Sequence, residues 1–529
     1  MSSKSARKLG FFAASAMLIG SVVGVGIFFK NGSIARATDS NGIAWLLAWI
    51  IGGIISLFAA INYSEISFLK PSKLNGLASW AYRIKGKKWG YFILFNYSFY
   101  YLSILGLLLS IIASEVTIYF ISEASGKSIS IPFYAHLLIG LAYLVFFVVL
   151  NFISIYTSGY IALITTILKF VPLIISLLAG IILPNTFNDG GQSTFVKEFI
   201  ASHPFDFKKV VIALPAVLFA YDSFLSVGSL HNKVKNANKS VPLIIVASMI
   251  LIVVVYTLIG LSSALHNKGN ILDLIKDVFP KEAAKGVGIF VALFLLISTL
   301  GVNNSFNAIY INQIRDLVAF NSVFGAKSLK AKFGQTKATI FYIIAVFIFW
   351  AIIIYIPSLA AWLPTKESLK AGGELVYKQG SDVIADSMSN FPSLIFFGLY
   401  MAIMIVYANR RKTLSNPKTR INDILFWVSS IFANIIIGVT IFAFVYTIIS
   451  EIDLKPFAPS SAGILADNGL YLTNSGNFGI FIFQLIIFLF FPIINYYLIK
   501  KVEKYDLFKE FDKLVEIDDS SEIQETQTI

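Results

Sequence analysis

The chain has 529 residues, of which 57% are apolar and 13% are charged, and its formal net charge is +13. An average soluble protein carries about 25% charged residues, so this composition excludes an ordinary soluble domain and indicates a membrane protein. The absence of cysteine excludes disulfides, Cys-ligated zinc and iron–sulfur clusters, and the four histidines are too scattered for a haem or zinc site. We therefore expect no metal and no cofactor.

Twelve apolar stretches are long enough to cross a bilayer as helices, since one crossing needs about 20 mostly apolar residues. They are too long and too continuous for barrel strands, which alternate over about ten residues. The sequence therefore predicts an all-α membrane protein with twelve transmembrane helices. In chain order the stretches cover residues 10–29, 43–69, 91–120, 133–150, 158–183, 210–231, 242–264, 286–314, 338–356, 391–409, 421–449 and 475–499.

Lysine and arginine are unevenly distributed between the loops. With the N-terminus placed inside, the inner segments hold 22 of them in 81 residues and the outer segments hold 14 in 131. This positive-inside pattern, with an even number of spans, places the N-terminal segment 1–9 and the polar tail 500–529 in the cytoplasm. The net charge is thus an orientation signal and an attraction to anionic lipid heads, and we expect no nucleic-acid partner. We predict a multi-pass protein of the plasma (cell) membrane with a solvated tail.

The first apolar stretch contains Gly20, Ser21, Gly24 and Gly26 in its middle. Each glycine lowers helix stability by roughly 1 kcal/mol relative to alanine. One interpretation is close helix packing, because Gly20 and Gly24 form a G-x-x-x-G pair. The other is a break in the helix, which leaves backbone amide and carbonyl groups free to bind a small molecule in a cavity.

The sixth stretch has Pro215 and Ser223 on either side of a central Asp222. A charged residue at the bilayer centre costs roughly 2.5–3.5 kcal/mol on insertion scales, so such residues usually have a function. The two weakened helices are five helices apart, as an inverted five-helix repeat would place them. We therefore expect a first repeat over 10–183, a second over 210–409, and two additional helices within 421–499.

Several motifs, in the same order and spacing, resemble those of the amino acid–polyamine–organocation (APC) transporters. The likeness runs from about residue 10 to residue 320, and each motif is weak by itself. The sequence departs from the family pattern at Asn75, Ser223, Leu225, His231 and Ala237. The motifs are Gly20-Ser21-x-x-Gly24-x-Gly26-Ile27-Phe28, Tyr63-Ser64-Glu65 with Pro71, Gly76 and Tyr82, Asn151 with Lys169 and Pro172, Phe219-Ala220-Tyr221-Asp222 with Lys235, Asn236 and Pro242, and Gly301 with Asn304 and Arg315.

This resemblance implies the LeuT-like 5+5 inverted-repeat fold, with discontinuous helices 1 and 6. It also implies that first-helix amides bind an amino acid's α-carboxylate and that carbonyls of both broken helices bind its α-ammonium. The physics favours the same polarity, because the opposed ends of two half-helices suit a zwitterion. The amides map to Val25, Gly26 and Ile27, and the carbonyls map to Val22, Val23, Phe219 and Ala220.

Four residues carry open alternatives. Phe219 or Tyr221 forms an outer lid over the substrate, or both are ordinary packing aromatics. Asp222 recognises a cationic side chain of the substrate, or it has a structural or gating role. Asn304 lines the cavity, or it forms interhelical hydrogen bonds.

Lys169 lies in the middle of the fifth apolar stretch. A charged lysine at that depth is costly unless it is partnered. In proton-coupled, sodium-independent relatives a fifth-helix lysine occupies the place of a sodium ion, and Lys169 resembles it. The alternative is a static ion pair with Asp222 or with Glu65, although we expect Glu65 to tie loops or gates to a basic neighbour.

We predict a secondary active transporter of amino acids that works by alternating access, is sodium-independent, and is proton-coupled or an exchanger. No catalytic or Walker motif is present in the sequence, so we expect neither an enzyme nor direct ATP drive. The alternatives are a facilitative channel or uniporter for small amines, or a transporter-like nutrient sensor. The sequence leaves open the substrate side chain, the oligomeric state and the role of the long outer segment 357–390.

Overall fold

The computed structural model describes most of the chain. The described residues are 8–24, 26–127, 129, 131–182, 204–266, 274, 278–362, 367–369, 375–377, 381–450, 452, 457–460, 469–472 and 474–516. Within them, twelve helical segments are long and apolar enough to cross a membrane, and each contains one of the twelve stretches predicted from the sequence or overlaps with it. The all-helical membrane fold is confirmed.

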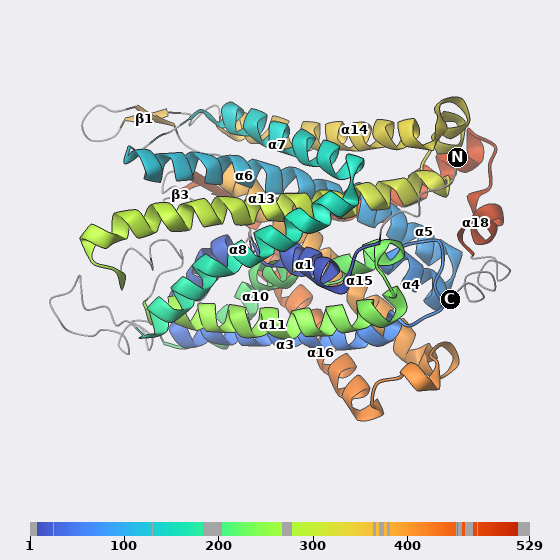
Figure 1. Cartoon of the computed structure of the whole chain (residues 1–529), viewed down its shortest axis with the longest axis horizontal. Helices are drawn as coiled ribbons and strands as arrows, with labels where there is room; N and C mark the ends of the chain where they lie inside the picture. The colour runs from blue at the N-terminus through green and yellow to red at the C-terminus, as the bar shows by residue number, and fades with distance from the viewer. Residues whose placement is uncertain are drawn as a thin grey trace.

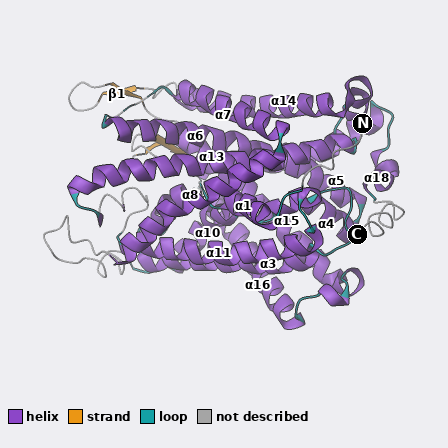
Figure 2. Ribbon diagram, viewed as in Figure 1, coloured by secondary structure: helices purple, strands orange, loops and turns teal. Residues whose placement is uncertain are grey.

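The spans form an elongated bundle of roughly parallel and antiparallel helices (Figures 1 and 2). Eight of them each consist of a single α-helix: α3 (Gly42–Ile66), α7 (Phe133–Ile153), α8 (Ile155–Ile182), α11 (Ala237–Leu265), α13 (Lys281–Ala319), α15 (Ser381–Leu414), α16 (Asp423–Ser450) and α17 (Asn474–Lys501). The third span joins α5 (Lys87–Asn96), a π-helical turn η2 (Tyr97–Tyr101) and α6 (Leu102–Ser125), and the ninth is α14 (Ala326–Trp362), interrupted at Gly334 by a positive φ of 79°.

The first and sixth spans are discontinuous, as predicted. The first consists of α1 (Phe11–Val22), a π-helical turn η1 (Gly26–Lys30) and α2 (Asn31–Ala37), and at Val23 the backbone is extended, with ψ 110°. The sixth consists of α10 (Phe207–Tyr221) and a 3₁₀-helix η3 (Ser226–Lys233), with an extended Asp222 and a left-handed Ser223 between them. The packing interpretation of the first-helix glycines also holds, since they are in close contact with other helices, as described below.

The broken helices lie inside the bundle. α1 contacts α8, α11 and α13, while α10 contacts α3, α15 and α16. Beyond the first break, Asn31 is buried and fixes α2: its Oδ1 accepts hydrogen bonds from the indoles of Trp45 and Trp49, and its Nδ2 donates to Ser263 on α11. Because a buried amide must find partners, these bonds set the position of the second half of the first helix.

One end of the bundle carries two short helices outside the predicted spans. These are α4 (Gly76–Lys85) and α18 (Leu507–Val515), which lies near α5 at the right of Figure 1. The side chains of Leu507, Phe511 and Val515 are fully buried. The expectation of a solvated tail is therefore wrong for this part of it, because α18 is amphipathic and packs its apolar face against the bundle.

Two short antiparallel hairpins lie in the predicted outer segments, at the opposite end of the bundle. Strand β1 (Glu367–Leu369) pairs with β2 (Leu375–Tyr377), within the long outer segment noted in the sequence. Strand β3 (Phe457–Ser460) pairs with β4 (Gly469–Leu472). Both hairpins lie outside the twelve spans and leave the helical core unchanged.

Candidate functional site

The two helix breaks meet in the middle of the bundle. Ser21 Oγ on α1 and Ser226 Oγ on η3 are hydrogen-bonded at 2.8 Å. A Cβ built on Gly26 would lie 2.5 Å from the Cα of Ala220, and one built on Gly24 would lie 2.1 Å from Cγ2 of Val302. Only glycine allows the first helix to approach both neighbours this closely.

A small enclosed cavity of about 30 Å³ lies beside the contact between the broken helices. It has room for one or two waters, so an amino acid enters only if the surrounding helices move apart. Its wall is apolar on the α6 and α13 sides and polar at the two breaks. The lining residues are Ser21, Val22, Gly26, Leu105, Leu109, Phe219, Asp222, Ser223, Val302, Phe306 and Ser393.

Asp222 is the acidic residue of this cavity and is buried at the break in the sixth helix. Its carboxylate accepts a hydrogen bond from Tyr101 Oη on η2 at 2.6 Å and one from the Ser223 amide at 2.7 Å. A long contact of 3.5 Å joins it to Tyr400 Oη on α15. The carboxylate therefore ties three helices together at the cavity wall.

Lys169 on α8 reaches the break in the first helix. Its Nζ donates to the carbonyl of Gly20 at 2.7 Å and to that of Val23 at 2.8 Å, and the side chain is fully buried. These carbonyls lie at or near the end of α1, where the helix dipole is negative and favours a cation. The alternative considered for Lys169, an ion pair with Asp222 or Glu65, is not formed in the described structure, where Asp222 accepts from Tyr101 and Glu65 pairs with Arg411.

Of the residues whose backbone was predicted to bind substrate, Val22, Gly26 and Phe219 line the cavity, whereas the Val23 carbonyl accepts from Lys169. Ile27 is buried one residue beyond Gly26 along η1. The Val22 carbonyl already accepts a bond of 2.9 Å from Tyr256 Oη, which leaves one lone pair for another donor. Val25 lies outside the described residues.

The two candidate lid aromatics have different positions. Phe219 lines the cavity, and its ring lies 4.7 Å from Lys30 Nζ. Tyr221 is fully buried between Trp49 and Tyr256, at ring distances of 5.8 and 5.1 Å, and is not part of the cavity wall described here. The geometry thus favours Phe219 for the lid.

Asn304 is used in helix packing. Its Oδ1 accepts hydrogen bonds from Asn151 on α7 and Ser158 on α8, and its Nδ2 donates to the Ser158 carbonyl. The residue is fully buried and is not among the residues that line the cavity. This arrangement favours interhelical hydrogen bonding over substrate contact.

Glu65 has the basic neighbour that the sequence predicted. Arg411 on α15 binds its carboxylate through two nitrogens at 2.8 and 2.9 Å, and Tyr407 and the amide of Ile421 add two further bonds. Arg411 also contacts Asp423 at the start of α16. This bidentate pair joins α3, α15 and α16 at the end of the bundle that carries α4 and α18.

Sequence reasoning missed the part of the cavity wall that comes from the third, eighth and tenth spans. Leu105, Leu109, Phe306 and Ser393 are ordinary residues of transmembrane helices that no motif marks, and Val302 lies between Gly301 and Asn304 of a motif but was not singled out. Tyr101 belongs to a tyrosine-rich run at 97–101, and η2 is a π-helical turn, which is frequent at functional sites. That run and the motif around Val302 were the signals in the sequence for this region.

Comparison with known proteins identifies the family. The amino acid permease family model matches residues 14–504. The serine/threonine exchanger SteT of Bacillus subtilis is 26% identical over 260 residues, which cover 48% of this chain and 54% of the relative. An aspartate–proton symporter of the same organism is 24% identical over 258 residues, or 48% of each chain. An uncharacterized protein of Mycoplasma pneumoniae is 21% identical over 462 residues, 78% of this chain and 80% of the relative.

The matches to the exchanger and the symporter span about half of each relative's length. The family match is much longer, and it includes both broken helices and ten further spans. Members of this family are transporters, which agrees with the absence of catalytic motifs in the sequence. With its twelve apolar helices and its breaks in the first and sixth of them, this chain belongs to the amino acid permease family of the APC superfamily and has the LeuT-like fold.

Proposed function

We propose that the protein is a secondary active transporter that moves amino acids across the membrane by alternating access. The observation that carries this proposal is the cavity at which the two broken helices meet, with non-helical backbone at both breaks and the Asp222 carboxylate in its wall. Non-helical backbone at membrane depth is tolerated where it lines a cavity. Discontinuous helices with their ends at a central site are the usual substrate site of secondary transporters.

We expect the substrate to bind at the two breaks as a zwitterion once the surrounding helices have moved apart. Amides at the start of η1 point their positive dipole end towards a carboxylate, and carbonyls at the ends of α1 and α10 accept from an ammonium. The apolar side chains of Leu105, Val302 and Phe306 would contact the substrate side chain, while Phe219 would close over it. The relatives include a serine/threonine exchanger and an arginine/ornithine antiporter. Their substrates support amino acids as the substrate class of this protein.

Proton coupling is assigned to Lys169. Its ammonium binds two carbonyl oxygens of the first helix, and the family resemblance implies that a lysine here stands in the place of a sodium ion. Loss of the proton would release the two carbonyls and change the helix break next to the cavity. The transport is therefore sodium-independent in this proposal, and the named aspartate–proton symporter supports the choice of proton.

The topology follows from the same proposal. Residues 10–183 and 210–409 form the two inverted repeats, and 421–499 adds two helices. The protein is placed in the plasma membrane with its N-terminus and tail in the cytoplasm, because lysine and arginine are concentrated at that end. The end that carries α4 and α18 is then the cytoplasmic end.

Counterflow in proteoliposomes tests the function directly. Purified protein is reconstituted into vesicles preloaded with one unlabelled amino acid, and entry of the labelled form is followed over time. Candidate substrates are chosen by a thermal-shift screen of all amino acids and common amines, since a ligand that binds the folded state raises the melting temperature. We expect saturable counterflow that protein-free vesicles lack. Conductance without counterflow would indicate a channel and contradict the proposal.

A further inference from the structure

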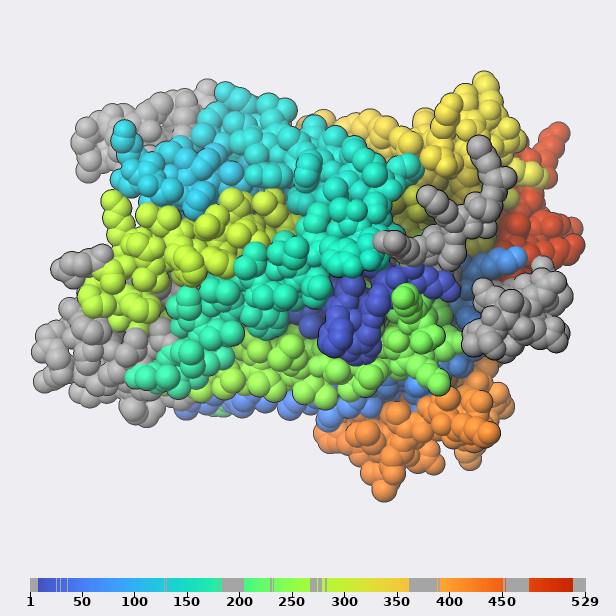
Figure 3. Space-filling view, in the orientation of Figure 1, coloured from blue at the N-terminus to red at the C-terminus, as the bar shows by residue number. Residues whose placement is uncertain are grey.

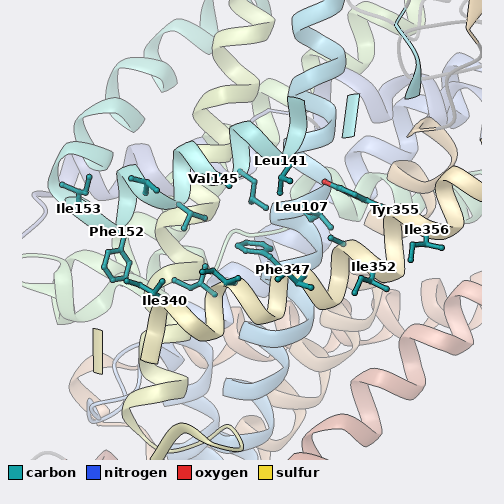
Figure 4. A pocket seen from close by; sticks show the side chains of 17 residues that line it. Leu107, Leu141, Val145, Phe152, Ile153, Ile340, Phe347, Ile352, Tyr355 and Ile356 are labelled. Atoms are coloured by element: carbon teal, nitrogen blue, oxygen red, sulfur yellow. The ribbon is translucent and has the colours of Figure 1, made fainter. Parts of the chain in front are cut away.

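A long apolar groove lies between α7 and α14, on the outer face of the bundle and away from the substrate cavity (Figure 4). Figure 3 shows the surfaces of these two helices next to each other at one edge of the bundle. Its volume is about 640 Å³, and its lining is apolar except for the hydroxyl of Tyr355. Leu107, Leu144 and Phe347 are buried at its floor, while Val145 and Ile348 are each 54% exposed on its walls. A groove of this size is within the range of about 300–1,000 Å³ that is typical of ligand sites.

The groove continues into a second cavity of different chemistry. This cavity has a volume of about 390 Å³ and shares Phe152 and Ile153 with the groove. Figure 4 shows these two residues and Ile340 at one end of the groove, with Tyr355 and Ile356 at the other. About half of the second cavity's lining is polar, and its polar side chains are Asn151, Ser154, Tyr156, Asn312 and Arg315.

Arg315 is the cation of the second cavity. Its guanidinium lies 5.3 Å from the ring centre of Phe152, and it forms no ion pair with another residue in the described part of the chain. The neighbouring Asp316 is engaged elsewhere, since its Oδ2 accepts from Asn75 Nδ2 at 2.7 Å. Lys337 is exposed on α14 one turn before Ile340, on the same face of the helix. Two cations therefore lie near the polar end of the groove.

We propose that the groove and the adjoining cavity together bind one anionic phospholipid. An acyl chain would lie in the groove, and the phosphate would bind Arg315 near the surface of the membrane. Arginine suits phosphate because its planar guanidinium donates two parallel hydrogen bonds. Basic pockets between transmembrane helices on the cytoplasmic side are known to hold anionic lipid head groups. A transmembrane helix of a partner or of a second copy would fill the groove but would leave this cavity unused.

The test measures lipid binding, which is independent of whether the protein transports amino acids. The full chain is purified in detergent and stripped of lipid. It is then titrated with dioleoyl phosphatidylglycerol, with dioleoyl phosphatidylcholine, or with inorganic phosphate. Native mass spectrometry counts the bound lipids, and the melting temperature gives the affinity. We expect phosphatidylglycerol to bind about tenfold more tightly than phosphatidylcholine, and phosphate alone to have no effect.

Five variants, two of them controls, localise the lipid. Arg315→Gln and Lys337→Gln should each weaken phosphatidylglycerol binding about fivefold, since one basic residue near the membrane surface contributes about 1 kcal/mol. The matched control Lys412→Gln changes an exposed lysine of α15 at the same end of the bundle and should have no effect. Ile348→Trp fills the groove and should abolish tight binding, whereas Ile435→Trp on the exposed face of α16 should not.

Several results would overturn the proposal. Equal affinity for the two lipids, or equal effects of the Arg315 and Lys412 variants, would show that the cavity does not select a phosphate. Binding of free phosphate with the affinity of the lipid would indicate a soluble anion site. Loss of a dimer in Ile348→Trp, with lipid binding unchanged, would assign the groove to a second copy. Lys337 is exposed, so its variant keeps the test valid if Arg315→Gln fails to fold.

Discussion

At the scale of single residues, the two central glycines of the first helix meet different kinds of neighbour. A Cβ on Gly24 would meet the Val302 side chain at 2.1 Å, whereas a Cβ on Gly26 would meet the Ala220 backbone at 2.5 Å. A mutation can shorten the Val302 side chain, but no mutation can remove the Ala220 backbone atom. The two positions therefore differ in whether a second substitution can compensate for an added methyl group.

We predict that Gly24→Ala destabilises the protein by about 1–3 kcal/mol, the usual cost of overpacking a core, and that Val302→Ala in the same chain restores most of the loss. Gly26→Ala should be damaging with or without Val302→Ala, which makes it the matched control. Melting temperatures of the single and double variants in detergent give the coupling between the two sites. Simple additivity of Gly24→Ala and Val302→Ala would contradict the prediction.

We predict that Lys169→Ala keeps substrate binding and loses the stimulation of uptake by an inward proton gradient. Removal of the ammonium frees the carbonyls of Gly20 and Val23 but leaves the cavity wall in place. Thr166→Ala is the control, because it removes a hydrogen bond from α8 to the Ala16 carbonyl without removing a charge. Uptake at several pH values in proteoliposomes measures the effect, and an unchanged pH profile in Lys169→Ala would reject the proton role.

At the scale of helices, the Glu65–Arg411 pair is the strongest polar link between α3 and α15 that the described structure contains. The Glu65 carboxylate is fully buried, and the Arg411 side chain is 6% exposed. Taking one partner away from a buried pair leaves a charge without compensation, which costs far more than the net value of the pair. The pair therefore keeps these helices together mainly because removing either partner leaves the other charge buried and unpaired, at a high cost in free energy.

We predict that Glu65→Gln lowers stability by about 3–5 kcal/mol, and that the double variant Glu65→Met with Arg411→Met recovers most of it. Asp423→Asn is the control: Asp423 also contacts Arg411 but its side chain is 79% exposed, so its loss should cost less than about 1 kcal/mol. Thermal unfolding in detergent measures all three. Equal effects of Glu65→Gln and Asp423→Asn would contradict the role of burial.

At the scale of the whole molecule, α18 brings the far end of the described chain onto α4 and α5. Arg83 donates to both oxygens of Glu516 at 2.7 and 2.8 Å, and Tyr82 adds a bond of 2.9 Å. These donors hold the pKa of the Glu516 carboxyl below its usual range, with the Arg83 hydrogen bonds as the main cause. Burial of an apolar side chain such as Phe511 contributes roughly 1.5–3 kcal/mol, more than an exposed ion pair.

We predict that α18 docking is strongest at neutral pH and weakens in acid. Docking of α18 lowers the pKa of Glu516. The contribution of the ionised Glu516 to docking is therefore complete above the ordinary glutamate pKa of about 4.3 and is lost as the pH falls through the lower pKa of the docked state. The chain has no cysteine, so spin labels at Lys88→Cys and Lys513→Cys report the distance directly. The docked fraction should fall below about pH 4.

Two variants of the labelled protein separate the charges from the apolar contacts. Glu516→Gln should reduce the docked fraction at neutral pH, whereas Phe511→Ser should release α18 at every pH, since burial of the Phe511 side chain outweighs the exposed pair. A docked fraction that is unaffected by Phe511→Ser would show that the ion pairs hold the helix by themselves.

The sequence by itself determined the twelve spans, the two breaks and the presence of Lys169 and Asp222 at membrane depth. Each of these is a local property: apolar length fixes a span, clustered glycine or proline weakens a helix, and a charge at membrane depth is costly wherever it lies. The pairing of Glu65 with a basic residue was also expected, because a buried carboxylate needs a partner, although the sequence could not say that this partner is Arg411.

Only the tertiary structure decided which of the candidates face the cavity. Phe219 and Tyr221 are two residues apart, yet one lines the cavity and the other packs between Trp49 and Tyr256. The same holds for Asn304, whose partners come from α7 and α8. These outcomes depend on how helices distant in sequence pack together, and neither apolar periodicity nor residue type within one span carries that information. The docking of α18 has the same cause, because its apolar face becomes buried only where α4 and α5 offer a complementary surface.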